Sequence, residues 1–286
     1  MPLLRPGDIV SRKSYSGDIF FKVTGMDKVG KSINLKGLNV RLIADAPPND
    51  LNLVSSREVY EYSKDFSKIT HDRVKKMIRS RWRGKGSAVS NEKGVGQSEF
   101  FEVPGRVLHL DGDEEYLDEC LKTYRQLNIN AKGLCYSERE QPKVLSKVLR
   151  ENPTDILVLT GHDGLLKGCK DFACIESYRS SKYFIESVTI ARCFEPNRDS
   201  LVIFAGACQS HYEAILQAGA NFASSPKRIL IHAFDPVFIV ERVAFTPIYE
   251  TVSLKDIIDN TVTGTDGVGG LETRGQLRLG YPRSPY

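Results

Sequence analysis

The chain has 286 residues, of which 41% are hydrophobic and 27% charged, a composition typical of a folded globular protein that excludes a disordered or collagen-like chain. Its 40 lysines and arginines against 36 aspartates and glutamates give a net charge of +4, which is too small to indicate nucleic-acid binding by itself. No apolar run approaches the about 18 residues that span a membrane, and the N-terminus lacks the hydrophobic core of a secretion signal, so we expect a protein made in the cytoplasm. Six cysteines without a CxxC pair fit that reducing compartment, and we expect no cofactor and no bound metal.

Residues 1–50 are predicted to form a small β-domain. Segments such as Ile19–Val23 and Ser32–Lys36 are rich in β-forming residues and are separated by glycine and aspartate turn signals. Several short strands at this spacing are typical of a small antiparallel barrel, so we expect an SH3-like β-barrel. Two consecutive prolines, Pro47 and Pro48, mark its end.

A helix and a linker are predicted over residues 51–100. Between Ser55 and Ser80, apolar residues recur at helical spacing with no glycine or proline among them. The segment that follows, Arg81–Gln97, is rich in glycine and has no apolar period, which predicts an exposed, flexible linker. The junction between the two segments is strongly basic.

Residues 101–286 are predicted to form a parallel α/β domain. Apolar segments alternate with helical ones, which is the pattern of right-handed βαβ crossovers. The predicted strands are continuous apolar runs, as expected of a sheet covered on both faces; they lie at 106–111, 131–136, 155–161, 200–207 and 228–233. The predicted fold class is therefore α/β, with a doubly wound, mostly parallel sheet. The glycine-rich stretch 263–285 is expected to form a flexible tail or an active-site flap.

Two reactive side chains follow consecutive strands of this predicted sheet. His162 comes directly after the segment 155–161, and Cys208 directly after 200–207. The carboxyl ends of parallel strands form the ligand-binding edge of such a sheet, so we expect the imidazole and the thiol to lie close together. An imidazole can take the proton of a thiol and return it to a leaving amine. We therefore predict Cys208 and His162 as a catalytic pair, with His211, three residues after the cysteine, as the competing partner.

Backbone amides beside these two residues are predicted to stabilise an oxyanion. The turn before Cys208 leaves its own N–H free, and a second N–H would come from Asp163 or Gly164. Cys208 also precedes a predicted helix, whose N-terminal dipole favours the thiolate. The pattern as a whole indicates nucleophilic hydrolysis.

The order of these motifs resembles the caspase-like cysteine peptidases, in which a histidine ends one strand and an Ala-Cys pair ends the next. The chain is also similar, over nearly its whole length, to the YabG family of sporulation-specific proteases; the segments that carry this resemblance are Gly7–Tyr15, Arg41–Pro47, Thr160–Asp163 and Ala205–Ser210. The resemblance implies a caspase-like fold and an endopeptidase that processes spore coat and cortex-associated proteins. It further implies cleavage after arginine, self-processing, and a location in the mother-cell cytoplasm with assembly into the spore coat.

Cleavage after arginine requires a carboxylate that meets the guanidinium in the substrate pocket. The acidic candidates at the predicted edge are Asp111, Asp113, Asp163 and Asp235. We predict Asp235, which would end the strand after the cysteine strand, as the floor of this pocket; an ordinary turn aspartate is an equal interpretation. Asp163 is the other predicted substrate-binding residue, with an alternative role in orienting His162.

Self-processing requires an accessible bond in the chain. Flexible basic segments are good protease substrates, which points to cleavage after Arg81 or Arg83 and release of the β-barrel. Arg274, in the glycine-rich C-terminal stretch, is a further candidate. A solvated basic helix end explains the same charge equally well.

Two other functions remain open from the sequence. The barrel and the basic helix could form a non-enzymatic adaptor for coat proteins or nucleic acid, although no aromatic stacking pattern or RNP-type motif is present. Alternatively, Asp111, Asp113 and Asp163 could hold magnesium in a hydrolase of another kind. We favour the cysteine peptidase and expect protein substrates, no membrane partner and no nucleic-acid partner.

Overall fold

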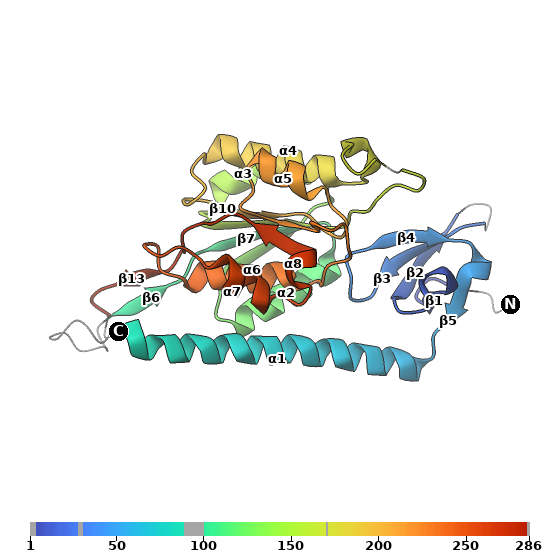
Figure 1. Cartoon of the computed structure of the whole chain (residues 1–286), viewed down its shortest axis with the longest axis horizontal. Coiled ribbons are helices and arrows are strands. Elements are labelled where there is room, and N and C mark those ends of the chain that lie inside the picture. The colour runs from blue at the N-terminus through green and yellow to red at the C-terminus, as the bar shows by residue number, and fades with distance from the viewer. Residues whose placement is uncertain (1–3, 28–30, 89–99, 170, 285–286) are drawn as a thin grey trace.

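The structure is a computed structural model that describes residues 4–27, 31–88, 100–169 and 171–284, without the side chains of 82–88. A small N-terminal sheet stands beside a layered α/β unit, and a long helix runs along both (Figure 1). The strands are β1 (Ile9–Arg12), β2 (Phe20–Met26), β3 (Ile33–Gly37), β4 (Ile43–Ala46), β5 (Leu51–Leu53), β6 (Phe101–Val103), β7 (Val107–Asp111), β8 (Ala131–Cys135), β9 (Ile156–Thr160), β10 (Val202–Ala205), β11 (Phe222–Ser224), β12 (Val268–Gly270) and β13 (Arg278–Gly280). The helices are α1 (Ser56–Ala88), α2 (Glu114–Gln126), α3 (Gln141–Glu151), α4 (Ser181–Phe194), α5 (Tyr212–Ala218), α6 (Asp235–Phe245), α7 (Leu254–Asn260) and α8 (Gly264–Gly267), with short 3-10 turns at Lys13–Tyr15, Pro48–Asp50 and Ile175–Ser177.

The N-terminal sheet is antiparallel, with the strand order β4-β3-β2-β1-β5. Residues at alternate positions, among them Val10, Phe21 and Leu35, face a small core of their own. Strand β5 pairs with β1, so the sheet extends past the predicted boundary at residue 50. Within the described residues no ladder joins β4 to β5, and the sheet is therefore open. The antiparallel β-domain is confirmed, whereas the SH3-like barrel is not.

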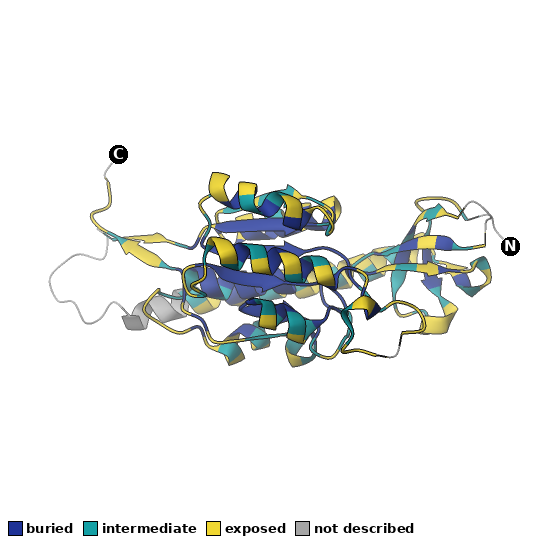
Figure 2. Ribbon diagram, turned by 90° about the horizontal axis from the view of Figure 1, so that it is seen from above, coloured by how far each residue is buried: buried dark blue, intermediate teal, exposed yellow. Residues whose placement is uncertain are grey.

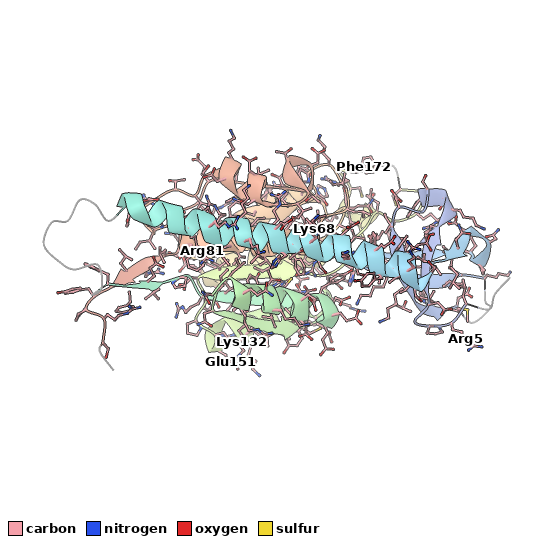
Figure 3. All side chains as sticks on the ribbon, turned by 90° about the horizontal axis from the view of Figure 1, so that it is seen from below. Arg5, Lys68, Arg81, Lys132, Glu151 and Phe172 are labelled. Carbon is pink, nitrogen blue, oxygen red and sulfur yellow. The ribbon has the colours of Figure 1, made fainter. Side chains whose placement is uncertain are left out.

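Helix α1 continues to Ala88, through the first part of the segment predicted to be a linker. Met77 is buried against the α/β unit, and Arg81 forms an ion pair with Glu241 at 3.0 Å. The Arg81 guanidinium also lies 3.9 Å from the centroid of the Phe245 ring. These tertiary contacts hold the helix end where the local sequence favours a linker. Figure 3 shows α1 crossing one side of the molecule, with Arg81 labelled toward its C-terminal end.

Six strands form the central sheet, in the order β12-β11-β10-β9-β7-β8. All its pairs are parallel except β11 with β12 at one edge. Helices α3, α4 and α5 cover one face, and α2, α6, α7 and α1 cover the other (Figure 1). Strands β7, β9 and β10 are buried along their whole length, and the outer surfaces of the helices that cover them are exposed (Figure 2). The predicted α/β unit with a mostly parallel sheet is confirmed.

Residues 228–233 were expected to form the fifth parallel strand, and this prediction is wrong. The strand beside β10 is β11, and residues 228–233 form a loop that follows it. This loop makes contacts other than sheet pairing: the amide of Ile231 binds Cys208, and His232 makes an isolated antiparallel bridge to Val40 of the N-terminal domain. The loop therefore passes over the edge of the sheet where the catalytic residues were predicted.

The C-terminal stretch is packed rather than a free tail. It forms α8, then β12 against β11, and finally β13, which pairs with β6. Thr273 and Gln276, between the last two strands, are buried. The glycines of this stretch allow close packing: a side chain on Gly270 or Gly275 would collide with neighbouring backbone.

Candidate active site

The predicted catalytic residues follow adjacent parallel strands. In the pairing of β9 with β10, Leu159 lies opposite Ala205, and His162 and Cys208 each come three residues after that pair. Adjacent strands are about 4.8 Å apart, so the two residues leave the sheet at the same level and on neighbouring strands. The structure thus brings both to the carboxyl edge of the sheet. Among the described residues, no hydrogen bond or ion pair joins the thiol directly to the imidazole.

Cys208 is completely buried. Its Sγ accepts a hydrogen bond from the N–H of Ile231 at 3.3 Å and lies 3.8 Å from the carbonyl oxygen of the same residue. Burial raises the pKa of this thiol to about 12, so the thiol is protonated at neutral pH in this conformation. The turn that leads to it depends on Gly206, whose φ of +114° is a conformation that favours glycine. In the described part of the chain the Cys208 N–H has no acceptor, as the oxyanion prediction requires.

His162 is buried and faces two carboxylates. Its Nε2 lies 3.3 Å from Oδ2 of Asp113, and its Nδ1 lies 3.7 Å from Oε1 of Glu138. The backbone N–H of His162 also donates to Glu138 at 2.6 Å. Burial alone would lower the pKa of His162, but hydrogen bonds and charge from Asp113 and Glu138 outweigh it and raise the pKa. Sequence reasoning named Asp113 only as a candidate for the arginine pocket or a metal and did not name Glu138, because the loops after β7 and β8 that carry them are positioned by the tertiary fold.

Asp163 does not face the imidazole. One carboxylate oxygen accepts hydrogen bonds at 2.8 Å from the N–H groups of Gly164 and Ser180, and the other accepts from the hydroxyls of Ser181 and Ser210. Burial raises the pKa of Asp163 to about 6, although these hydrogen bonds act in the opposite direction. Asp163 thus ties the loop after β9 to α4 and to the turn after the cysteine. The N–H of Gly164, predicted as an oxyanion donor, is engaged by this carboxylate.

Asp235 begins helix α6 instead of ending a strand. Its carboxylate accepts hydrogen bonds from the N–H of Val262 at 2.6 Å, from the N–H of Thr263 at 3.4 Å and from the Thr263 hydroxyl. Burial raises the pKa of Asp235 to about 6. These contacts hold the turn before α8 against α6. A substrate-binding role for Asp235 or Asp163 remains a prediction that none of their contacts supports.

His211, the competing histidine, caps helix α5. Its Nδ1 accepts a hydrogen bond from the N–H of Ala214 at 3.4 Å, and its Nε2 lies 3.0 Å from the carbonyl oxygen of Ala173. Its ring is 5.0 Å from the ring of Tyr178, centroid to centroid. Both ring nitrogens of His211 are therefore engaged by backbone groups.

Asp111 and Asp113, at the same edge of the sheet, face different partners. Asp111 is buried and forms an ion pair with Arg41, whose Nη1 lies 2.5 Å from Oδ2. Asp113 faces His162 and also Lys36, whose Nζ lies 2.5 Å from Oδ2. Burial would raise the pKa of Asp113, but His162 and Lys36 lower it to about 2. No group of three or more His, Cys, Asp or Glu side chains in the described part of the chain is arranged to hold a metal ion.

The predicted self-cleavage sites differ in their accessibility. Arg81 lies within α1 and is half-buried by its contacts with Glu241 and Phe245. The side chain of Arg83 is outside the described residues. Arg274 is exposed, and its N–H donates to Asp199 at 2.9 Å. Cleavage after Arg81 or Arg83 stays a prediction, and it requires local opening of α1.

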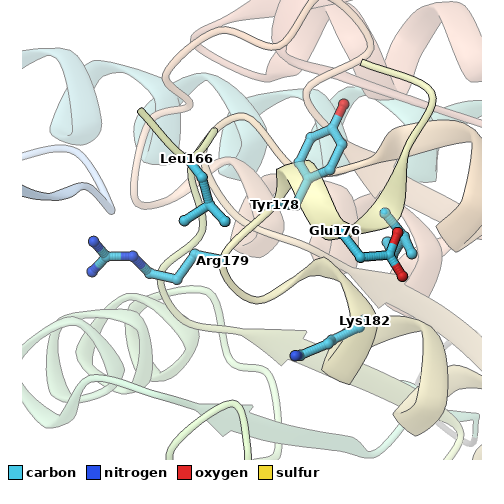
Figure 4. A pocket seen from close by; sticks show the side chains of 6 residues that line it. Leu166, Glu176, Tyr178, Arg179 and Lys182 are labelled. Carbon is cyan, nitrogen blue, oxygen red and sulfur yellow. The ribbon is translucent and has the colours of Figure 1, made fainter. Parts of the chain in front are cut away.

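Two cavities lie near this edge of the sheet. The larger, of about 870 Å³, lies between α1, α2 and the loops of residues 38–39 and 233–234, with Phe66 and Tyr116 in its wall. The smaller, of about 270 Å³, is formed by the loop between β9 and α4, where Leu166, Tyr178 and Lys182 line it (Figure 4). Neither His162 nor Cys208 lines either cavity, because the thiol and the imidazole are covered by protein.

The chain is similar to a known protein family over nearly its whole length. The model of the family described as YabG peptidase U57 matches residues 5–282. The chain is 41% identical over 282 residues to the sporulation-specific protease YabG of Bacillus subtilis (strain 168), which covers 96% of this chain and 97% of that protein. No solved structure matches the chain. In the described residues, no helix is both long enough and apolar enough to cross a membrane.

Proposed function

Because the chain belongs to the YabG peptidase family, we propose that it is a cysteine endopeptidase of sporulation in which Cys208 is the nucleophile and His162 its base. The register of β9 and β10 carries this proposal, since it places the two residues at equal distances beyond a directly paired position. The family match supports a peptidase, and the geometry supports the cysteine type. The caspase-like arrangement of a histidine strand beside a cysteine strand is part of the same proposal.

The proposed reaction begins when His162 takes the proton from Sγ of Cys208. Both ring nitrogens face carboxylates in this structure, Nε2 that of Asp113 at 3.3 Å and Nδ1 that of Glu138 at 3.7 Å, so this step requires the imidazole to turn one nitrogen toward the thiol. The thiolate then attacks the scissile carbonyl carbon, and the N–H of Cys208 stabilises the charge on the oxygen. The imidazolium, stabilised by Asp113 and Glu138, gives its proton to the leaving nitrogen as the C–N bond breaks.

A thioester between Cys208 and the acyl part of the substrate remains. Water attacks this thioester, and His162 accepts a proton from the water. The C–S bond then breaks, and the proton returns to the sulfur. The cycle uses groups of this chain and one water molecule.

The finer parts of the proposal concern substrates and location. The proposed substrates are proteins of the spore coat and cortex, cleaved after arginine, and the enzyme also processes itself. The proposed location is the mother-cell cytoplasm and the assembling coat. The name of the Bacillus subtilis relative supports the sporulation part. Buried acidic groups at the site support the preference for a basic residue.

The experiment that tests the proposal uses the full chain and two substitutions, Cys208→Ala and His162→Ala. Each is incubated with a protein substrate rich in arginine, and the product ends are identified by mass spectrometry. We expect cleavage by the wild type and none by either variant, with folding checked by circular dichroism. Cys193→Ala is the matched control, because Cys193 is an exposed cysteine and should be dispensable. Cleavage by folded Cys208→Ala protein would refute the proposal.

A further inference from the structure

A loop of the N-terminal domain inserts an arginine into the edge of the central sheet. This loop joins β3 to β4, and the Arg41 side chain on it is completely buried. The guanidinium forms the ion pair with Asp111 and lies 3.4 Å from both the carbonyl oxygen of Ala233 and the Sγ of Cys120. It also lies 5.0 Å from the centroid of the Tyr116 ring. The pocket thus supplies a carboxylate, a carbonyl and an aromatic face, which is what a guanidinium requires.

The backbone of the same loop pairs with the segment that binds the catalytic thiol. Val40, directly before Arg41, forms an antiparallel bridge with His232, and the N–H of the adjacent Ile231 binds the thiol. Proteins commonly hold extended peptides through such backbone pairing, with a side-chain pocket to give specificity. The loop therefore has two features of a bound substrate, which are independent of each other.

We propose that Arg41 occupies, from within its own chain, the subsite that selects arginine in substrates, and that Asp111 is the floor of this subsite. This inference rests on the proposed peptidase function. The N-terminal domain then occludes the catalytic centre, and a substrate arginine must displace Arg41 to react. Asp111 takes the role that sequence reasoning gave to Asp235.

The local backbone explains why Arg41 blocks the site without being an ordinary substrate. The N–H of Leu42 donates to the carbonyl of Val40 at 2.7 Å, so the chain turns sharply at Arg41. The carbonyl of Leu42 is held in turn by the N–H of Gly37 at 2.8 Å. A peptide bond in a tight turn is not presented to the thiol in extended form. The loop therefore blocks access to the thiol, and Cys208 is completely buried.

The Asp111 pocket also gives a physical reason for exchange with a substrate. Asp111 has no exposed surface, and an empty pocket would leave its charge buried and unpaired. Another guanidinium can replace Arg41 there, whereas a neutral side chain cannot. Other ion pairs between the two domains are Lys36 with the exposed Glu115 at 2.7 Å and Lys22 with the same carboxylate at 3.2 Å, which add little, and the largely buried pair of Lys36 with Asp113, which a departing domain must also break.

The first test compares Arg41→Gln with the wild type and with Arg12→Gln. Arg12 lies in the same domain and pairs with Asp50 at 2.9 Å, away from the thiol, which makes it the matched control. The initial rate of hydrolysis of a short fluorogenic peptide ending in arginine is measured on freshly purified full-length protein. We expect Arg41→Gln to hydrolyse the peptide at least about tenfold faster than the wild type, because only a minor fraction of wild-type molecules has an unblocked site. Arg12→Gln should match the wild type. Folded Arg41→Gln protein with an unchanged or lower rate would overturn the inference.

The second measurement tests the inference even if Arg41→Gln folds poorly. The double variant Arg41→Gln, Asp111→Asn has no unpaired charge in the pocket, and alkylation by iodoacetamide is mapped on each cysteine by mass spectrometry. Exposed Cys135 and Cys193 are internal references in both proteins, and buried Cys120, which contacts Arg41, is a reference in the wild type only. We expect Cys208 to react as slowly as Cys120 in the wild type and to approach the exposed cysteines in the variant. Equal protection of Cys208 in both proteins would contradict occlusion by the loop.

The third measurement addresses the floor of the subsite. Asp111→Asn is assayed with two peptides that differ only in having arginine or glutamine before the scissile bond. We expect the variant to lose at least about tenfold of the preference for arginine while it retains hydrolysis of the glutamine peptide. An equal loss on both peptides would show that Asp111 is only structural. If Cys208→Ala abolishes hydrolysis while these variants behave as the wild type, the inference fails and the proposed function stands; if Cys208→Ala remains active, the proposed function fails.

Discussion

Replacing Arg41 by methionine is predicted to destabilise the folded chain by about 3–5 kcal/mol at pH 7, the usual cost of removing one partner of a buried ion pair. The structure places this pair at the upper end of such effects, because both side chains have no exposed surface. Methionine fills most of the volume but leaves the carboxylate of Asp111 without a cation. The carboxylate then keeps only the Thr160 hydroxyl at 2.9 Å, the N–H of Asp113 at 3.0 Å and the imidazole of His109 at 3.4 Å among its described hydrogen-bond and ion-pair partners.

The pH dependence of this effect has a definite sign. In the wild type, burial would raise the pKa of Asp111, but the charge of Arg41 and the hydrogen bond with His109 outweigh it and hold the pKa well below its ordinary range. The stability that this depressed pKa contributes is present above the unfolded pKa and is lost as the pH falls through the folded pKa. In Arg41→Met, burial dominates and raises the pKa of Asp111, so the variant loses stability as the pH rises above the unfolded value. The difference between the two proteins should therefore be largest near neutral pH and shrink as the pH falls toward 4.

Urea unfolding followed by circular dichroism measures this difference, with Cys208→Ala as the background so that self-cleavage does not interfere. The free energy of unfolding is compared at pH 7 and pH 5 for Arg41→Met and for Arg41→Met, Asp111→Asn. The double variant should recover much of the loss, because it removes the unpaired charge. A difference below about 1 kcal/mol that does not change with pH would refute the reasoning.

Three further predictions concern contacts of Glu138 and Asp163 at the site and the packing of helix α1. Glu138→Gln removes a carboxylate that raises the pKa of His162, so the acidic limb of the kcat/KM profile should move to lower pH; an unchanged limb would contradict this role. Asp163→Asn removes a charged acceptor of four hydrogen bonds and should lower the free energy of unfolding by about 1–3 kcal/mol, seen as a lower Tm, with kcat reduced more than KM is raised. Met77→Ala empties a buried position between α1 and the core and should cost about 2–5 kcal/mol in urea unfolding, whereas Tyr60→Ala on the exposed side of α1 should cost almost nothing.

The placement of His162 and Cys208 after adjacent strands was predictable because it depends on strand order and register. Continuous apolar runs indicated parallel strands, and His162 and Cys208 follow two of them directly. The error at residues 228–233 has a physical cause: that segment is as apolar as a strand, but its backbone binds Cys208 and bridges to the N-terminal domain, and Leu230 packs against the core of that domain. Local composition does not distinguish a strand from a buried loop.

The partners of the pair could not be predicted from the sequence in the same way. Arg41 and Asp111 are 70 positions apart and belong to different domains. Glu138 reaches His162 only because the loops after β8 and β9 come together at one edge of the sheet. The helical end of α1 is likewise fixed by Glu241 and Phe245, far along the chain. Each of these contacts is set by tertiary packing, which overrides local propensity.

The most direct test of Cys208 as the nucleophile is to map the residue to which an arginine peptide with a thiol-reactive chloromethyl ketone becomes attached. The full chain is incubated with this reagent, and adducts and residual hydrolysis are followed together by mass spectrometry and a peptide assay. We expect one adduct, on Cys208, that forms in step with the loss of activity and much more slowly in His162→Ala. Complete inactivation without an adduct on Cys208, or full activity with Cys208 alkylated, would contradict this expectation.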